Sequence, residues 1–242
     1  MSFEEIQANV QMLHAEEGLK WLNNHFGATV KLSSALGPEA QLLTYWISQN
    51  HLQTEVFTID TGRLFQETYD LLELTNTILK SNIKVYYPDT RTIEKMVSRK
   101  GPNSFYHSIE NRIECCDARK VMPLKRALTG ATVWVTGVRA DQSHSRTHMK
   151  KIEWNETYNV IKYNPLLDWS AEQVLDLIDE FNIPTNTLYR QGYASIGCQP
   201  CTRAIRPGED ERSGRWWWEN SHKECGLHVN HATAEVQELI KT

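Results

Sequence analysis

The chain has 242 residues, and its five cysteines are the side chains with the widest choice of chemistry. Four of them form two close pairs: Cys115 and Cys116 in IECCDARK, and Cys198 and Cys201 in GCQPCTR. Thiolate pairs that a fold brings together hold iron–sulfur clusters or structural zinc, because such centres need several soft anionic ligands. The side chains of two adjacent cysteines diverge and must be bent toward one centre. A cluster with separate iron corners tolerates this divergence better than one compact metal ion does. The pattern favours a [4Fe–4S] cluster, with structural zinc and buried or redox-active thiols as alternatives.

The fifth cysteine, Cys225, stands in KECGLH close to the C-terminus. Lys223, His222 and His228 would favour its thiolate, and Glu224 would oppose it. A terminal segment that swings would let this thiol meet a bound substrate and then a protein reductant. An incidental surface thiol is the simpler interpretation of a lone cysteine.

The composition restricts the class of protein. With 40% hydrophobic residues, the chain can bury one large core or a main domain with an appendage. A formal net charge of −4 provides no positive field, so no nucleic acid is expected as a partner. No stretch approaches the roughly 20 apolar residues of a membrane span, and the start, MSFEEIQANV, is acidic where a signal peptide is basic. We therefore expect a soluble, cytoplasmic protein with no membrane partner, in which five cysteines do not form a disulfide framework.

Extended and helical patterns alternate along most of the chain. Strand-like runs cover 28–32, 55–59, 84–87, 132–136 and 159–163, and helical patterns cover 39–48, 64–78 and 92–98. This alternation predicts an α/β fold, a parallel sheet with helices on both faces. The polar, basic stretch 138–151 is predicted as a long loop over the carboxyl ends of the strands, where open α/β sheets bind ligands.

Further helices are predicted outside this alternation. Ser2 and Glu5 form a capping box, and an apolar stripe continues to Gly27, which predicts one opening helix. Ser170 is predicted to cap a later helix. We divide the chain into an N-terminal helical segment, 1–27, a main α/β domain, 28–205, and a C-terminal tail, 206–242.

Several motifs, in their order along the chain, match a known family. They are SSALGPEA at 33–40, IDTGRLFQETY at 59–69, CC at 115–116, GCxPCTR at 197–203, GRWWWE at 214–219 and KECGLH at 223–228. With them the chain resembles the assimilatory adenylyl-sulfate reductases, the cluster-containing branch of the phosphoadenylyl-sulfate reductase family. The resemblance implies an adenine-nucleotide hydrolase-like α/β sheet with a flexible, catalytic C-terminal tail.

The resemblance also assigns roles to the cysteines. It implies that Cys225 is the nucleophile that takes the sulfonate from adenylyl sulfate, and that the other four cysteines hold the cluster. His228 would assist acid–base chemistry or tune Cys225. A thioredoxin or glutaredoxin-like reductant would then release sulfite, with AMP as the other product, in assimilatory sulfate reduction.

The remaining motifs supply candidate substrate-binding residues. Ser33, Ser34 and Gly37 follow the first predicted strand, where hydroxyl and N–H groups at a helix N-terminus cradle anions, although an ordinary turn has the same pattern. The resemblance places a second group at the rim of the nucleotide and active site, for which a turn and helix cap is the alternative: Asp60, Thr61, Gly62 and Arg63.

Cationic side chains form a third group of candidates. Arginine grips phosphate and sulfate oxygens well, although a solvated surface position is the common alternative for any one of them. The resemblance favours a binding role for Lys120, Arg139, Arg212 and Arg215, and it implies that the charge of Lys120 would lie between the cluster and the sulfate and link them. Trp216, Trp217 and Trp218 are expected to pack under the tail rather than bind substrate. The candidate cations are Lys120, Arg139, Arg146, Arg212 and Arg215.

Three other functions remain as alternatives to adenylyl-sulfate reduction. The same reaction on phosphoadenylyl sulfate needs few additional donors for one more phosphate. A zinc-stabilised binding module without turnover would leave Cys225 with no function. An ATP-consuming adenylating enzyme is disfavoured because the first loop lacks a Ser-Gly-Gly-x-Asp signature. The chain is compatible with a homo-oligomer.

Overall fold

The structure is a computed structural model that describes residues 1–142 and 146–219. Its centre is a six-stranded sheet in the order β3-β2-β1-β4-β6-β5. The strands are β1 (Val30–Ser33), β2 (Glu55–Ile59), β3 (Lys84–Tyr86), β4 (Val133–Thr136), β5 (Ile152–Asn155) and β6 (Val160–Tyr163). Neighbouring strands are parallel except at one edge, where β5 pairs antiparallel with β6. The predicted α/β fold is therefore confirmed, as a mostly parallel mixed sheet.

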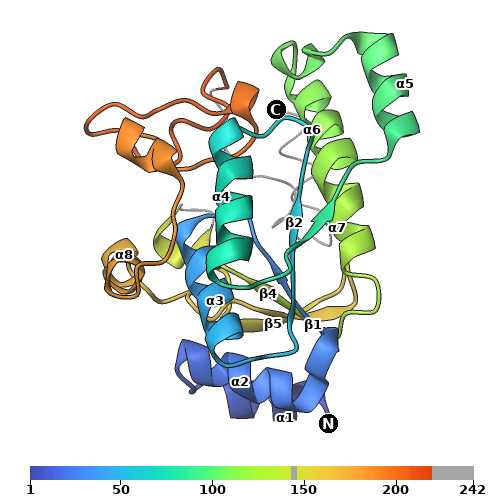
Figure 1. Cartoon of the computed structure of the whole chain (residues 1–242). Helices are drawn as coiled ribbons and strands as arrows, with labels where there is room; N and C mark the ends of the chain where they lie inside the picture. Colours follow the sequence, from blue (N-terminus) through green and yellow to red (C-terminus); the bar gives the residue numbers. More distant parts are fainter. Residues whose placement is uncertain (143–145, 220–242) are drawn as a thin grey trace.

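Helices cover both faces of this sheet (Figure 1). Val56 of β2 belongs to a core formed with the N-terminal helices, whereas its neighbour Phe57 packs with Leu124 on the other face. Strands β2 and β4 are thus buried on both faces, which explains their largely apolar sequences. The helices are α1 (Phe3–Val10), α2 (Ala15–Phe26), α3 (Pro38–Gln49), α4 (Gln66–Ile78), α5 (Thr90–Lys100), α6 (Ile109–Cys116), α7 (Met122–Ala127) and α8 (Ala171–Glu180).

The N-terminal segment forms two helices, so the predicted single helix was wrong. The Ser2–Glu5 capping box is present, but α1 ends at Val10 and α2 begins after His14. An α-helix turns about 100° per residue, so one straight helix would place Leu19 roughly opposite Ile6. Both residues are buried in the same core. The break between the two helices is what allows both apolar groups to face the sheet.

The segment predicted as a long loop, 138–151, lies between the end of β4 at Thr136 and the start of β5 at Ile152, as expected. After the short 3₁₀ turn Ala140–Gln142, the chain re-enters the sheet as β5. Asn159, with φ of 54°, lies in the turn that joins β5 to β6. Asparagine accepts this left-handed conformation more readily than most residues. The sequence around Trp154 therefore forms an antiparallel edge strand that the alternating pattern did not predict.

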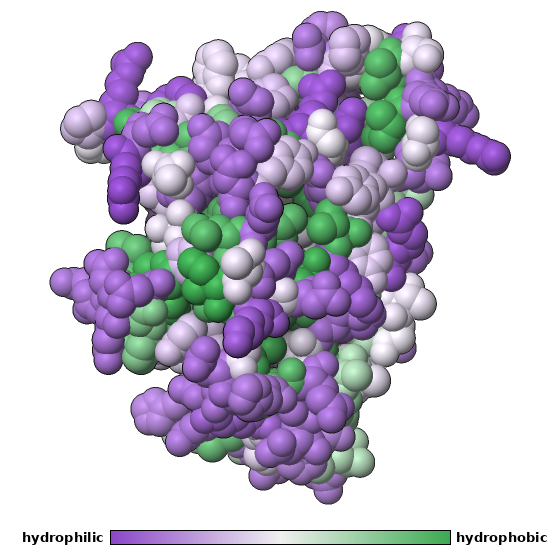
Figure 2. All heavy atoms as spheres, viewed as in Figure 1, coloured by the Kyte–Doolittle hydropathy of each residue, from purple (hydrophilic) through white to green (hydrophobic). Residues whose placement is uncertain are grey.

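The outer surface differs from place to place. Figure 2 shows hydrophobic side chains gathered across the middle of one face, with hydrophilic side chains above and below them. This band lies at the height of α3, α8 and the sheet in Figure 1. Within 1–142 and 146–219, none of the helices is both long enough and apolar enough to cross a bilayer.

The sheet positions the candidate residues through the carboxyl ends of its central strands. β1 ends at Ser33, β2 at Ile59 and β4 at Thr136. Because β1 lies between β2 and β4 in parallel, these three ends meet at one edge of the sheet. The motifs that follow the three strands are thereby brought together, as expected for an open α/β sheet.

Tyr163 provides a test of how this core is packed. Its side chain is fully buried, and its Oη has no hydrogen-bond partner among the described residues. Burial raises the pKa of Tyr163 above its ordinary value. A Cβ at Gly18 would lie 2.0 Å from this oxygen, so Gly18 provides the space for it.

We predict that Tyr163→Phe raises the free energy of unfolding by about 1 kcal/mol, because it removes a desolvated hydroxyl and leaves the ring in place. Urea unfolding would measure the change. Tyr69→Phe is the matched control with the opposite sign, since the Tyr69 hydroxyl donates to Asp60 at 3.0 Å. A Tyr163→Phe protein less stable than the parent would contradict the prediction.

Candidate active site

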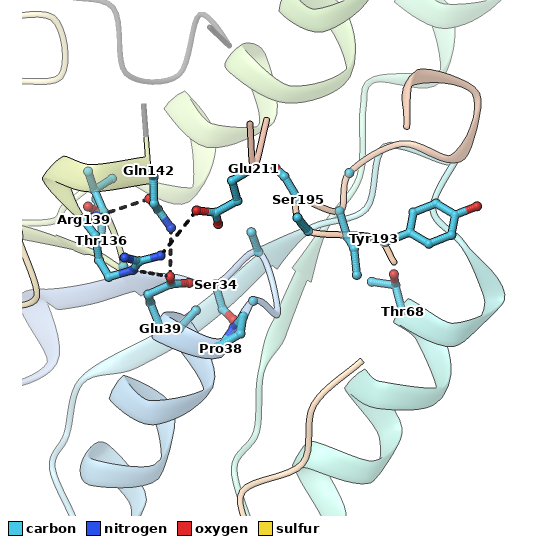
Figure 3. A pocket seen from close by; sticks show the side chains of 18 of the residues that line it. Ser34, Pro38, Glu39, Thr68, Thr136, Arg139, Gln142, Tyr193, Ser195 and Glu211 are labelled. Atoms are coloured by element: carbon cyan, nitrogen blue, oxygen red, sulfur yellow. Dashed lines mark hydrogen bonds and ion pairs between the residues drawn. The ribbon is translucent and has the colours of Figure 1, made fainter. Parts of the chain in front are cut away.

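A cavity of about 630 Å³ opens at the carboxyl ends of β1, β2 and β4. This volume is typical of small-molecule and nucleotide sites. Figure 3 shows side chains from the first loop, from the end of β4 and from the 193–211 region pointing into it. The lining contains ten of the sequence-predicted residues: Ser33, Ser34, Gly37, Thr61, Lys120, Arg139, Arg146, Cys198, Arg212 and Arg215.

The first loop forms one wall of this cavity. The Ser34 backbone N–H donates to Phe57 O at 2.7 Å, and the Ser34 hydroxyl accepts from Leu36 N–H at 3.1 Å. Gly37 caps α3 without a side-chain hydrogen bond, and Pro38 occupies the start of the helix, where proline is favoured. No side chain at the N-cap position therefore occupies the first amides of α3, and such amides favour an anion at a helix N-terminus.

Gly137 allows the end of β4 to approach the start of α3 closely. A Cβ at Gly137, just after β4, would lie 3.1 Å from Ala40 N and 3.0 Å from the Glu39 side chain. The end of β4 thus touches the first turn of α3. A larger residue in place of Gly137 would push the two apart and open this wall of the cavity.

The turn after β2 is held by its own side chains. The Asp60 carboxylate accepts from Gly62 N–H at 2.7 Å, and Gly62 has φ of 70°, which favours glycine. Thr61 lines the nucleotide-sized cavity, but Asp60, Gly62 and Arg63 do not. Arg63 instead lies beside the cysteines, with its guanidinium 5.0 Å from the Phe105 ring centre.

Arg139 lies at the centre of a buried polar network that the sequence did not predict (Figure 3). Its Nε donates to Glu39 at 2.7 Å, and its other nitrogens face Asp141 and, at 3.6 Å, Glu211. Gln142 also donates to Glu39, at 2.8 Å. One guanidinium therefore faces three carboxylates, two of which line the cavity.

Crowded negative charge affects titration at this end of the cavity. Burial raises the pKa of Glu211, and the neighbouring Glu39 adds to the shift while Arg139 opposes it. Burial, with the charges of Glu39 and Glu211, also raises the pKa of Tyr189. No local sequence signal marks Glu39 and Glu211 as a pair, because α3 and the 209–211 region are far apart in the chain.

The four cysteines of the two predicted pairs line a second, smaller cavity. Cys115 and Cys116 are the last residues of α6, which continues into the π-helical turn Asp117–Val121. Cys198 is the N-cap of a short 3₁₀ turn, Gln199–Cys201, and Cys201 is its last residue. In the described part of the chain, no three His, Cys, Asp or Glu side chains are placed to hold a single metal ion.

Burial is the largest cause of the pKa shifts of Cys115 and Cys201. It raises the pKa of Cys115, and it raises the pKa of Cys201 to about 12, with Cys198 as a second cause. Positive side chains oppose the shift: Arg119 at Cys115, and Lys120 and Arg215 at Cys201. Buried thiols surrounded by cations are suited to an anionic metal–sulfur centre, which such cations would stabilise.

The π-helical turn places two cations beside the cysteine pair. Its i→i+5 spacing puts Lys120 one turn from Cys115. Lys120 lines both cavities, so it lies in the wall that they share. Arg119, which sequence reasoning missed, donates from Nη1 to Thr61 O at 2.6 Å. Thr61 in turn contacts Cys198, with 3.2 Å between Oγ1 and Sγ.

Buried N–H groups provide a test of whether a cluster fits. Arg119 Nε, Arg215 Nε and Trp216 Nε1 are buried and have no hydrogen-bond partner among the described residues. Arg119 and Trp216 line the cysteine cavity. Such donors are costly to bury unless something accepts from them, and the sulfur atoms of a cluster are acceptors that tune its potential. Four cysteines, cations and unsatisfied donors together fit a cluster.

The tryptophan run packs against the same cavity. Trp216 is fully buried, with the guanidinium groups of Arg112 and Arg215 each 4.9 Å from its ring centre. Trp218 stacks edge-on against Tyr106 at 4.5 Å, whereas Trp217 is half exposed. The predicted packing role is confirmed for Trp216. Cys225 and His228, the predicted nucleophile and its neighbour, lie outside the described residues.

The sequence of this chain is similar to those of several known proteins. Residues 29–204 match the family model of the phosphoadenosine phosphosulfate reductase domain. The adenosine 5'-phosphosulfate reductase of Agrobacterium fabrum is 46% identical over 204 residues, which cover 84% of this chain and 78% of that protein. The protein of the same name from Allochromatium vinosum is 47% identical over 201 residues, covering 83% and 78% of the two chains.

Solved structures agree on the architecture. The phosphoadenylyl-sulfate reductase from Candida auris, in a phosphate complex, superposes with a TM-score of 0.70 at 26% identity, covering 84% of this chain and 96% of that one. Yeast FAD synthetase in complex with FAD has a TM-score of 0.50 at 13% identity, covering 84% and 74%. The second likeness shows a shared fold alone.

Proposed function

The chain belongs to the phosphoadenosine phosphosulfate reductase family, and on that premise we propose that it reduces adenylyl sulfate to sulfite and AMP in sulfate assimilation. The observation that carries the proposal is the wall shared by two cavities. A nucleotide-sized cavity and a cavity lined by four cysteines meet at Lys120 and Cys198. Relatives at 43% to 48% identity bear the name adenosine 5'-phosphosulfate reductase.

The substrate would bind with its anionic groups toward that shared wall. Lys120, Arg212 and Arg215 line the cavity there or nearby, and the N-terminus of α3 approaches it from the first loop. Phosphate and sulfate oxygens are the acceptors that such donors bind best. Ser33, Ser34, Gly37 and Thr61 would contribute loop contacts. Arg139 and Arg146 would act at the end of the cavity that holds Glu39.

A [4Fe–4S] cluster is the centre that the four cysteines suit best. Cys115, Cys116, Cys198 and Cys201 would hold it, and Arg119, Arg215 and Trp216 would direct N–H groups at its sulfur atoms. When bound, such a cluster would supply structural cohesion and an electrostatic field, because cysteine chemistry already accounts for the electrons. Lys120 would stand between this charge and the substrate sulfate.

The proposed reaction begins with nucleophilic attack by the Cys225 thiolate on the sulfate sulfur. A sulfur–sulfur bond forms, the bond from sulfur to the bridging phosphate oxygen breaks, and AMP leaves with that electron pair. Lys120 and the arginines stabilise the charge that develops on the leaving phosphate. The enzyme then carries an S-sulfocysteine at Cys225.

A dithiol reductant of the thioredoxin or glutaredoxin class would complete the cycle. One of its thiolates attacks Cys225 Sγ and expels sulfite, and its second thiol resolves the mixed disulfide and regenerates the Cys225 thiol. The two electrons that reduce the sulfate sulfur come from the oxidation of this dithiol. A reducing compartment, which we propose to be the cytoplasm, would supply it. In this scheme the nucleophile Cys225 is carried by the C-terminal tail, 206–242.

For the proposed reaction, the first prediction concerns the cluster ligands. Replacing any one of Cys115, Cys116, Cys198 and Cys201 with serine should bleach the broad absorption near ~400 nm and abolish most activity, since each thiolate holds one iron corner. Spectra and iron and sulfide content of protein purified without air would measure this. Cys225→Ser is the matched control and should keep its colour. Full iron and sulfide in two or more of the four variants would exclude the cluster assignment.

A second prediction concerns the nucleophile. Incubation with adenylyl sulfate and no reductant should add one sulfonate, about 80 Da, to the peptide that contains Cys225, because nothing is present to cleave the new bond. Mass spectrometry would detect it. The Cys225→Ser protein should still bind AMP but form no adduct and release no sulfite. Turnover by that variant at a rate comparable to the parent would refute the mechanism.

A third prediction concerns the choice of nucleotide. The value of kcat/KM for adenylyl sulfate should exceed that for phosphoadenylyl sulfate by at least about tenfold, roughly 1.4 kcal/mol in transition-state binding. The reason is electrostatic, since Glu39 and Glu211 line the cavity and Arg139 is already paired with carboxylates. Steady-state kinetics with each nucleotide would decide, and equal values would favour the phosphoadenylyl-sulfate alternative.

A further inference from the structure

A buried ion pair at the last described residue has no role in the reaction proposed above. Arg112 Nε donates to Glu219 Oε1 at 2.9 Å, and Arg112 Nη2 donates to Glu219 Oε2 at 3.0 Å. The two side chains are only 6% and 4% exposed. Glu219 stands six positions before Cys225 in the sequence.

The pair joins the segment 214–219 to the helix that carries one cysteine pair. Arg112 lies on α6, three and four residues before Cys115 and Cys116, and it lines the cysteine cavity. Its guanidinium also faces the Trp216 ring at 4.9 Å. The contact from α6 is therefore made both to an aromatic ring and to a carboxylate of the same segment.

The same segment is bonded to the turn that carries the other cysteine pair. Arg203 N–H donates to Gly214 O at 3.0 Å, and Trp216 N–H donates to Cys201 O at 3.1 Å. Glu219 N–H then donates to Trp216 O at 2.9 Å. Residues 214–219 thus form a bridge between the two cysteine-bearing elements, and the ion pair lies where this bridge ends.

A buried ion pair contributes little net stability, because desolvation offsets the attraction between its charges. Its best-supported use is to select one arrangement of the chain over others. Here the bidentate contact also defines both the position and the direction of the carboxylate, as paired arginine and carboxylate groups do. Small net stability and a defined geometry both indicate that the Arg112–Glu219 pair positions the chain rather than stabilises the fold.

We propose that the Arg112–Glu219 pair is the fixed point from which the segment carrying Cys225 is presented to the nucleotide cavity, so that both are positioning residues for sulfonate transfer. Six residues span at most about 20 Å when extended, so the place where Glu219 is held limits where Cys225 can act. The inference rests on the proposed function, in which Cys225 is the nucleophile.

The test compares the single-turnover rate of Cys225 sulfonation with nucleotide binding and cluster content. Glu219→Gln keeps the side-chain shape and removes the charge, and it should slow sulfonation at least about tenfold, since small misplacements of a reacting group have effects of this size. The dissociation constant for AMP should stay within about twofold, and absorbance per chain near ~400 nm should be unchanged. A Gly-Ser insertion after Glu219 leaves the ion pair intact and should also slow sulfonation.

Glu209→Gln is the matched control. Glu209 makes the same two-point contact with Arg203, at 2.7 and 3.0 Å, but this pair is about one-third exposed and lies outside both cavities. Its sulfonation rate should match the parent. Arg112→Lys, which keeps the charge but not the planar fork, should fall between the parent and Glu219→Gln.

Three results would overturn the inference: parental sulfonation rates in both the Glu219→Gln and the insertion variants, a loss that only follows lost cluster absorbance, or an equal loss in Glu209→Gln. Failure of the underlying function is distinguishable from all three. In that case the parent itself, with intact colour, would form no adduct at Cys225 and the proposed reaction would fall together with this inference.

Discussion

Buried positive charge beside the four cysteines is the constraint that organises the surrounding structure. Guanidinium groups are stable in the interior only where carboxylates or carbonyl oxygens accept from them. Arg119 therefore requires the carbonyl of Thr61, and Arg112 requires the carboxylate of Glu219. The first requirement ties the turn after β2 to the end of α6, and Gly62 provides the left-handed conformation that this turn needs. The second ties the end of the described chain to α6. These contacts connect the elements that carry the cysteines to the turn after β2 and to residues 214–219.

Charged side chains also make the two ends of the nucleotide-sized cavity different. At the end shared with the cysteines, Lys120 and Arg215 lower the pKa that burial would otherwise give Cys201. At the other end, Arg139 faces three carboxylates, and burial together with Glu39 raises the pKa of Glu211. A ligand with one anionic group would be oriented by this asymmetry, because its charge is stabilised at one end and repelled at the other. In the proposed reaction that orientation directs the sulfate toward Lys120.

The sequence predicted the features that depend on local pattern. Strands such as β2 and β4 are buried on both faces, so their apolar runs were visible, and caps such as Ser2 and Ser170 were read correctly. The prediction of a single N-terminal helix was wrong, because the apolar residues were counted as one stripe without their angular positions around the helix axis. The antiparallel strand β5 was missed because it lies at an edge, where polar residues are tolerated. Arg119, Glu39 and Glu211 were missed for another reason: their partners are distant in sequence, so only the fold reveals them.

The position of residues 214–219 bears on why a thiol-based reaction would need a cluster at all. These residues were assigned to the tail by sequence, yet Trp216 bonds to the backbone of Cys201 and Glu219 to Arg112 on α6. If a cluster joins Cys115 and Cys116 to Cys198 and Cys201, it also holds together the two elements that this segment bridges. A cluster in this place would therefore act on the reaction through geometry, by preserving the surface from which Cys225 extends, as well as through its charge near Lys120.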